Sequence, residues 1–168
     1  MQELIDVLVE TQKAKSLEVA KKLQLLGADV DTYDLVIRNA NLSIDDAEKI
    51  ADAIYRVSQK NGPDLHTISM SFNQNLKDEG FLAILDKIPN TTTVIAFVEC
   101  GITDIAGQAI IDWASENVGL TGIYIEGNAF SKSMEAKFGK LRVENPQLTV
   151  LSEWASEEFK AMVKRTFD

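Results

Sequence analysis

One eleven-residue pattern occurs twice between residues 92 and 130, and it constrains the fold more than any other feature. Residues 92–102 and 120–130 align with a shift of 28 positions (128 − 100), and both are apolar at places four, six and eleven. Apolar residues at places four and six lie on the same face of a short strand. Place nine holds Cys100 or Asn128, and a small polar side chain there suits a turn whose backbone amides lack partners in the sheet.

A third copy precedes this pair. Residues 65–73 carry the same strand pattern, with Asn73 at place nine, 27 positions before Cys100 (100 − 73). Its eleventh place is polar, because Asn75 stands there and the apolar Leu76 comes one position late. The third copy therefore predicts a strand followed by a locally distorted turn.

Two degenerate copies lie towards the ends of the chain. Residues 32–42 form the first, with Ala40 at place nine, 33 positions before Asn73 (73 − 40). Residues 145–150 carry only the strand core, with Leu148 and Val150 expected at places four and six. Such weakening is typical of the terminal units of a stacked array.

The hydrophobic period changes from two to about 3.6 between these strands, which indicates strand–helix units. Ser43, Thr103 and Ser131 each follow place nine by three positions and suit the N-cap of a helix. A small residue lies seven positions after place nine in three copies, as expected where a helix packs closely on its strand. These small residues are Ala47, Gly80 and Gly107.

The pattern resembles the consensus L-x-x-L-x-L-x-x-N/C-x-L of leucine-rich repeats, and the helical returns resemble the ribonuclease-inhibitor-like class, whose units have about 28 residues. The resemblance implies an α/β fold. It would be a short leucine-rich repeat solenoid with parallel strands on the concave face, helices on the convex face and helical caps at both ends. Spacing and length are also similar to the C-terminal repeat domain of tropomodulin, an actin-capping protein, and to short bacterial leucine-rich repeat effectors.

The 168 residues suit a single domain. Residues 1–31 are expected to form an N-terminal helical cap, in which Ser16 caps the second of two helices. About five repeats follow over residues 32–151, three of them sound and two degenerate. Residues 152–168 are expected to form a C-terminal capping helix that covers the last strand.

Composition limits the partners and the location. A net charge of −9 and a pI near 4.7 argue against nucleic acid and anionic membranes. No stretch reaches the roughly eighteen apolar residues of a membrane span, the start lacks the basic region of a signal peptide, and a single cysteine forms no internal disulfide. We expect a cytoplasmic protein. The effector resemblance would add secretion into a host cell without a cleavable signal peptide, with residues 152–159 as an export tag or only a cap.

The side chains of a catalytic or metal site are nearly absent. His66 is the single histidine and is expected at an exposed strand lip. Cys100, like Asn73 and Asn128, is expected to be a structural turn residue, and a thiol inside a turn is inert. No zinc-type Cys/His spacing and no glycine-rich phosphate loop occurs. We predict that the protein is not an enzyme and uses no metal or cofactor.

The outward strand places three, five, seven and eight are expected to line the concave face. They bring an apolar and aromatic set together with charged residues at its sides, a mixture that protein interfaces favour. The candidate partner-binding residues are Arg38, Phe72, Val94, Val98, Glu99, Tyr124 and Glu126. The alternative is that β-branched residues merely suit strands and a terminal helix folds over them.

The leading hypothesis is a non-catalytic, acidic interaction module, favoured as a monomer, that binds another protein through the concave face. The resemblances imply either an actin-linked, tropomodulin-like role or an effector role. A second hypothesis is an enzyme or cation-binding protein that uses the carboxylates of Glu99 and Glu126, on strands about 5 Å apart, although their places eight and seven need not converge. A third is a purely structural fragment of a larger assembly, against which both ends look capped.

Overall fold

In a computed structural model of the protein, residues 1–27 and 30–167 are described, with the side chains of residues 166 and 167 excepted. These residues form seven helices and five strands. The elements are α1 (Gln2–Glu10), α2 (Ala14–Gln24), β1 (Thr32–Val36), α3 (Ile44–Gln59), β2 (Asp64–Ser69), α4 (Lys77–Leu85), β3 (Val94–Ala96), α5 (Asp104–Glu116), β4 (Gly122–Tyr124), α6 (Lys132–Glu144), β5 (Thr149–Leu151) and α7 (Glu157–Phe167). The expected N-terminal cap and C-terminal helix extend over residues 28–29 and 168, which lie outside this description.

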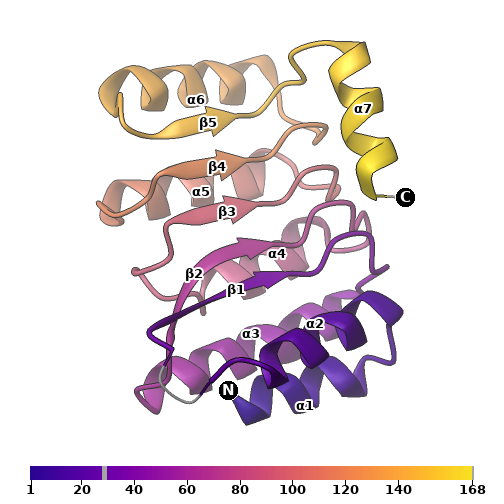
Figure 1. Cartoon of the computed structure of the whole chain (residues 1–168). Coiled ribbons are helices and arrows are strands. Elements are labelled where there is room, and N and C mark those ends of the chain that lie inside the picture. Colours follow the sequence, from indigo (N-terminus) through magenta and orange to yellow (C-terminus); the bar gives the residue numbers. More distant parts are fainter. Residues whose placement is uncertain (28–29, 168) are drawn as a thin grey trace.

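The five strands form one sheet, in which every neighbouring pair is parallel and the strand order follows the chain. An α/β fold with parallel strands is thereby confirmed. Helices α3 to α6 lie along one face of the sheet, and α1 and α2 lie beyond β1 (Figure 1). The other face carries no helix except where α7 approaches the carboxyl ends of the strands (Figure 1). We call this other side the strand face.

One buried residue of each strand lies in register across the whole sheet, and this row is the centre of the core. Its members are Leu35, Ile68, Ile95, Ile123 and Val150, each no more than 1% exposed. The first four are the place-four residues of the sequence pattern. The fifth is not, because Val150 was expected at place six. A shift of two residues keeps the same side chains on the buried face, so the pattern alone does not exclude it.

The predicted N-caps are confirmed at three helices. Ser43 accepts a hydrogen bond from the Asp46 amide in a full capping box, and Thr103 and Ser131 cap α5 and α6. The expected cap at Ser16 is wrong, because α2 begins earlier, after Lys13, and Ser16 is buried within its first turn.

Two acids join each helix start to the next one. The Asp78 carboxylate accepts hydrogen bonds from the Thr103 amide (2.8 Å) and hydroxyl (2.6 Å), and Asp104 accepts from the Ser131 amide (2.8 Å) and hydroxyl (2.5 Å). These bonds hold the Asp104 pKa below its usual value, chiefly through the Ser131 hydroxyl. The Asp78 and Asp104 carboxylates thus tie the start of one helix to the start of the next.

The small residues seven positions after place nine lie where helices approach one another. A Cβ on Gly80 would come within 3.4 Å of the Ala47 Cβ, and one on Gly107 would come within 2.8 Å of the Met134 Cγ. The turn after β2 is distorted as expected, since Leu76 is fully buried in the place that Asn75 should have filled. Within the described ranges, no helix is both long and apolar enough to cross a membrane.

The sequence suggested that the last helix covers the outer edge of β5, but the helix does not lie there. It turns back past the carboxyl ends of β4 and β3 (Figure 1), and the Lys164 Nζ forms an ion pair of 2.9 Å with Glu99, which follows β3. Strand β5 pairs with β4 alone. The C-terminal helix therefore borders the strand face, and at β5 it is the Arg142 guanidinium of α6 that donates to the Val150 carbonyl, at 3.4 Å.

Candidate functional site

A pocket of about 270 Å³ lies between the strand face and α7, and it brings together most of the predicted binding residues. We call it the strand-face pocket. Its lining includes six of the seven residues predicted from sequence, namely Arg38, Phe72, Val94, Val98, Tyr124 and Glu126. Glu99, the seventh, lines a different pocket. The sequence analysis missed Trp154, Phe159 and Val163, which form the side of the pocket next to the C-terminal helix.

The lining is less open than a bare sheet face would be. Val98 is 8% exposed and Glu126 is 5% exposed, although both lie on the side of the sheet without covering helices. The α7 residues Phe159 and Val163 line the pocket together with these two residues. This is the alternative expected from the sequence, in which a terminal helix folds over the strands. The strand-face pocket is thus a partly covered trough rather than an open surface.

Arg38 marks the end of the pocket nearest β1. Its Nε donates a hydrogen bond of 3.0 Å to the Ser69 hydroxyl, and burial lowers the pKa of the guanidinium. The Ser69 hydroxyl lies 3.5 Å from that of Ser71, which accepts from the Val98 amide at 3.2 Å. The polar groups at this end are therefore bonded to one another and fix the guanidinium in place.

Glu126 marks the other end, beside β4, and its environment differs. Its Oε2 is buried and finds no hydrogen-bond partner among the described residues, and the same holds for the Trp154 Nε1. Burial raises the pKa of the Glu126 carboxyl. On the neighbouring strand the Glu99 amide donates to the Glu126 carbonyl at 2.9 Å, and the Glu99 carboxylate pairs with Lys164, while Tyr124 lines the same pocket as Glu126.

Tyr124 owes its position to a glycine on its own strand. Its ring lies over Gly122, where an added Cβ would come within 2.8 Å of the ring Cε2. Any larger residue at this place would push the ring off the sheet. Glycine is otherwise unfavourable in a strand interior, so its presence here is explained by the close approach of the ring.

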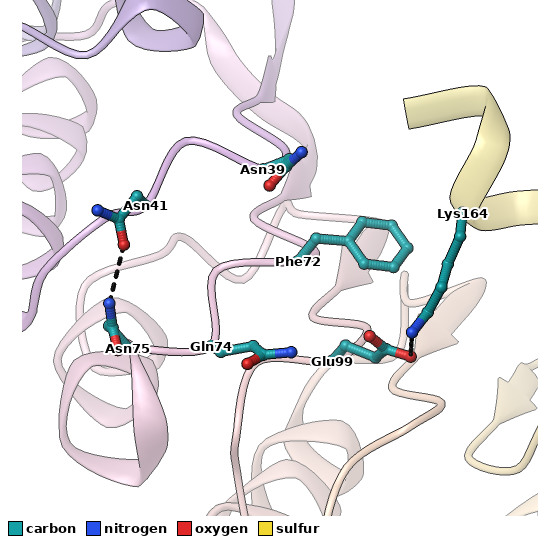
Figure 2. Close-up of a pocket in the computed structure, with 7 residues that line it drawn as sticks. All are labelled: Asn39, Asn41, Phe72, Gln74, Asn75, Glu99 and Lys164. Carbon is teal, nitrogen blue, oxygen red and sulfur yellow. Dashed lines mark hydrogen bonds and ion pairs between the residues drawn. The ribbon is translucent and has the colours of Figure 1, made fainter. Parts of the chain in front are cut away.

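Glu99 lies in a second, polar pocket of about 350 Å³ (Figure 2). Its carboxylate turns towards Lys164, which extends from α7, and the Phe72 ring points towards the same helix (Figure 2). Asn39, Asn41, Gln74 and Asn75 complete the lining, and the Asn75 amide donates to the Asn41 side chain at 2.8 Å. Glu99 and Glu126 thus face different pockets. The described ranges hold no group of three or more acidic, histidine or cysteine side chains suited to a metal ion.

Place eight has a left-handed backbone in every sound repeat and in the first degenerate one. The residues there are Asn39 (φ 49°), Phe72 (φ 64°), Glu99 (φ 49°) and Gly127 (φ 73°). This conformation costs a residue with a side chain roughly 1–2 kcal/mol. Phe72 and Glu99 bear that cost beside the two pockets, and strain of this kind concentrates at functional sites.

Place nine sits directly behind these turns and holds them. The Asn73 Oδ1 accepts from the Ala40 and Leu42 amides at 2.9 and 3.1 Å, while its Nδ2 donates to the Ile37 and Met70 carbonyls at 2.9 and 2.8 Å.

Asn128 repeats this arrangement two units further on, after the unit of Cys100. It accepts from the amides of Cys100 and Ile102 and donates to the carbonyls of Phe97 and Ile125. The Cys100 thiol donates to the Met70 carbonyl at 3.2 Å, and burial raises its pKa to about 12. These groups support the site and do not line it.

His66 is exposed and lies away from both pockets. Its Nδ1 lies 3.3 Å from the Asp34 carboxylate and 3.1 Å from the Thr67 hydroxyl. No catalytic arrangement of nucleophile and base forms around it among the described residues. No protein-family model matches the chain, and the curated proteins include no match to it.

Proposed function

We propose that the chain is a short leucine-rich repeat solenoid of the ribonuclease-inhibitor-like class, and that it binds another protein through the strand-face pocket without catalysing a reaction. Support for the solenoid comes from the repetition of one unit. The strands pair in chain order, and Asn73 and Asn128 make the same four hydrogen bonds to equivalent backbone groups. Stacked units of this kind present a rigid, pre-organised surface.

One observation carries the binding proposal: apolar and aromatic residues from four successive strand–turn units converge on a single pocket on the strand face, which α7 covers only in part. Phe72, Val94 and Tyr124 are only partly buried there. Aromatic side chains are enriched at the energetic centres of protein interfaces. Neither the actin-linked role nor the effector role gains a specific residue from this pocket, so the proposal is limited to a protein-binding module.

The test compares two double variants as baits in affinity capture from lysate. Phe72→Ala with Tyr124→Ala should remove the captured partner, because it removes both aromatic anchors. Ile105→Ala with Val143→Ala is the matched control, since both residues are exposed apolar positions on helices, at 65% and 79%. It should retain the partner.

Circular dichroism and urea unfolding establish that both variants are folded before capture. Capture that survives loss of the two aromatic rings, or that is lost equally in the helix-face control, would refute binding through the strand face.

A further inference from the structure

The starting point is the Glu126 carboxyl group, which is buried without being satisfied. The residue is 5% exposed, and its Oε2 has no partner among the described residues. Glutamate is almost never buried unless it is paired, because removing a carboxylate from water costs several kcal/mol. A protonated carboxyl would still leave its O–H without an acceptor. The site is therefore chemically incomplete, and a cation would complete it.

The surroundings of Glu126 suit an organic cation. Trp154, Tyr124 and Phe159 line the same pocket, and the Trp154 and Phe159 ring centroids lie 6.4 Å apart. Aromatic rings attract ammonium and guanidinium groups through their faces. They offer no oxygen or nitrogen ligands of the kind that hard metal ions require.

Two cations beside the described pockets have other partners. Lys164 pairs with Glu99 at 2.9 Å. Arg38 bonds to Ser69 on β2, two strands away from Glu126, or roughly 10 Å at the usual strand spacing of about 4.8 Å. No described side chain bonds to the Glu126 Oε2, so a bound partner would supply the missing cation.

The size of the pocket and the charge of the chain indicate what kind of molecule this is. At about 270 Å³ the pocket has room for one long side chain. A net charge of −9 attracts basic partners. The unpartnered Trp154 N–H adds a donor suited to a peptide carbonyl.

We propose that the Glu126 end of the strand-face pocket receives a lysine or arginine side chain of the protein partner. The cationic head binds the Glu126 carboxylate, the stem packs on Tyr124 and Phe159, and the carbonyl of the same residue accepts a hydrogen bond from the Trp154 Nε1. The inference rests on the proposed function and names the anchor by which the partner is held. The Glu126 Oε2 is covered, so the aromatic side chains around it must move before a cation can enter. Phe159 on α7 is 39% exposed, and an exposed side chain changes rotamer readily.

The test uses single-residue probes and the intact ¹⁵N-labelled protein. N-acetyl-lysine N-methylamide and its arginine counterpart are titrated to millimolar concentration, with N-acetyl-norleucine N-methylamide as the neutral isostere of lysine. The readouts are the amide signals of Tyr124 and Glu126 and the indole N–H signal of Trp154, assigned with Trp154→Phe. Both basic probes should bind at least about tenfold more tightly than the norleucine probe, as expected for a hydrogen bond to a charged group.

Glu126→Gln should weaken the basic probes to the level of norleucine. Glu153→Gln is the matched control, because it removes the same charge from an exposed position beside Trp154, and it should bind as the wild type does. Equal binding of lysine and norleucine probes, wild-type affinity in Glu126→Gln, or no shift with either basic probe would each overturn the inference. None of these results affects the capture experiment with Phe72 and Tyr124, so the two proposals fail separately.

Discussion

Replacing Asn73 by Ala should cost the fold about 4 kcal/mol. The side chain is fully buried and makes four hydrogen bonds of 3.1 Å or less, which join the turn after β1 to the turn after β2. Each bond contributes about 1 kcal/mol net, and the two amides and two carbonyls left behind are buried. Since domains unfold at about 5–15 kcal/mol, the variant should remain folded but weakened. Urea unfolding with linear extrapolation measures the loss as a lower midpoint at an unchanged slope.

Asn128 offers a matched comparison within the same molecule. It makes the same four bonds two repeats later, but it is partly exposed, so water can replace the amide in an Ala variant. We expect Asn128→Ala to lose about half as much as Asn73→Ala, roughly 2 kcal/mol. A loss below about 1 kcal/mol for Asn73→Ala, or an equal loss for both variants, would refute the reasoning that burial of these bonds holds the turns.

Three further predictions follow from single positions. Gly101→Ala should destabilise the fold by at least about 2 kcal/mol, because φ is 72° and the new Cβ would lie 2.8 Å from the Gln74 carbonyl oxygen. Gly139→Ala lies in a helix with open space around it and should raise the free energy of unfolding by up to about 1 kcal/mol. Urea unfolding measures both. Glu126→Gln should flatten the pH dependence of the free energy of unfolding. Burial raises the Glu126 pKa above its ordinary value of 4.5, so the folded state holds the proton more tightly, and this stabilising contribution is complete below pH 4.5 and is lost as the pH rises through the folded pKa. The Cys100 thiol, with a pKa of about 12 through burial, should resist iodoacetamide at pH 8 until the protein is unfolded.

Each of these three has a result that would contradict it. Equal stability of the two glycine variants would contradict the first. A free energy of unfolding that changes with pH in Glu126→Gln as it does in the wild type between pH 4 and 8 would contradict the second. Labelling of the native Cys100 thiol at the rate seen in urea would contradict the third.

The sequence predicted the sheet well because one face of every strand is buried. Alternation at places four and six fixes which side chains face the core, and the residues Ile95 and Ile123 pair across the sheet as the 28-residue offset requires. The helix starts after Ser43, Thr103 and Ser131 were also predicted, because a hydroxyl before an apolar stripe is typical of an N-cap. These features depend on neighbours in the chain or on strict periodicity.

What the sequence did not predict depends on weaker or longer-range packing. The path of α7 is set by the Lys164–Glu99 ion pair and the lining residues Phe159 and Val163, none of which follows a period shared with the repeats. As a result, the burial of Glu126 was missed. The one available signal was the amphipathic stripe of the last helix. Such a stripe indicates that the helix packs on the protein, but it does not indicate which residues the helix covers.

The Asn73 bonds also have a consequence for the order in which the protein forms on the ribosome. The Leu42 amide, just after β1, finds its acceptor 31 residues later in the chain, on Asn73. At about 5–20 residues per second, a nascent turn waits about 2–6 s for the side chain that completes it. Each coil of the emerging chain is therefore finished by its successor, and native structure lags translation by one unit from the amino terminus onward.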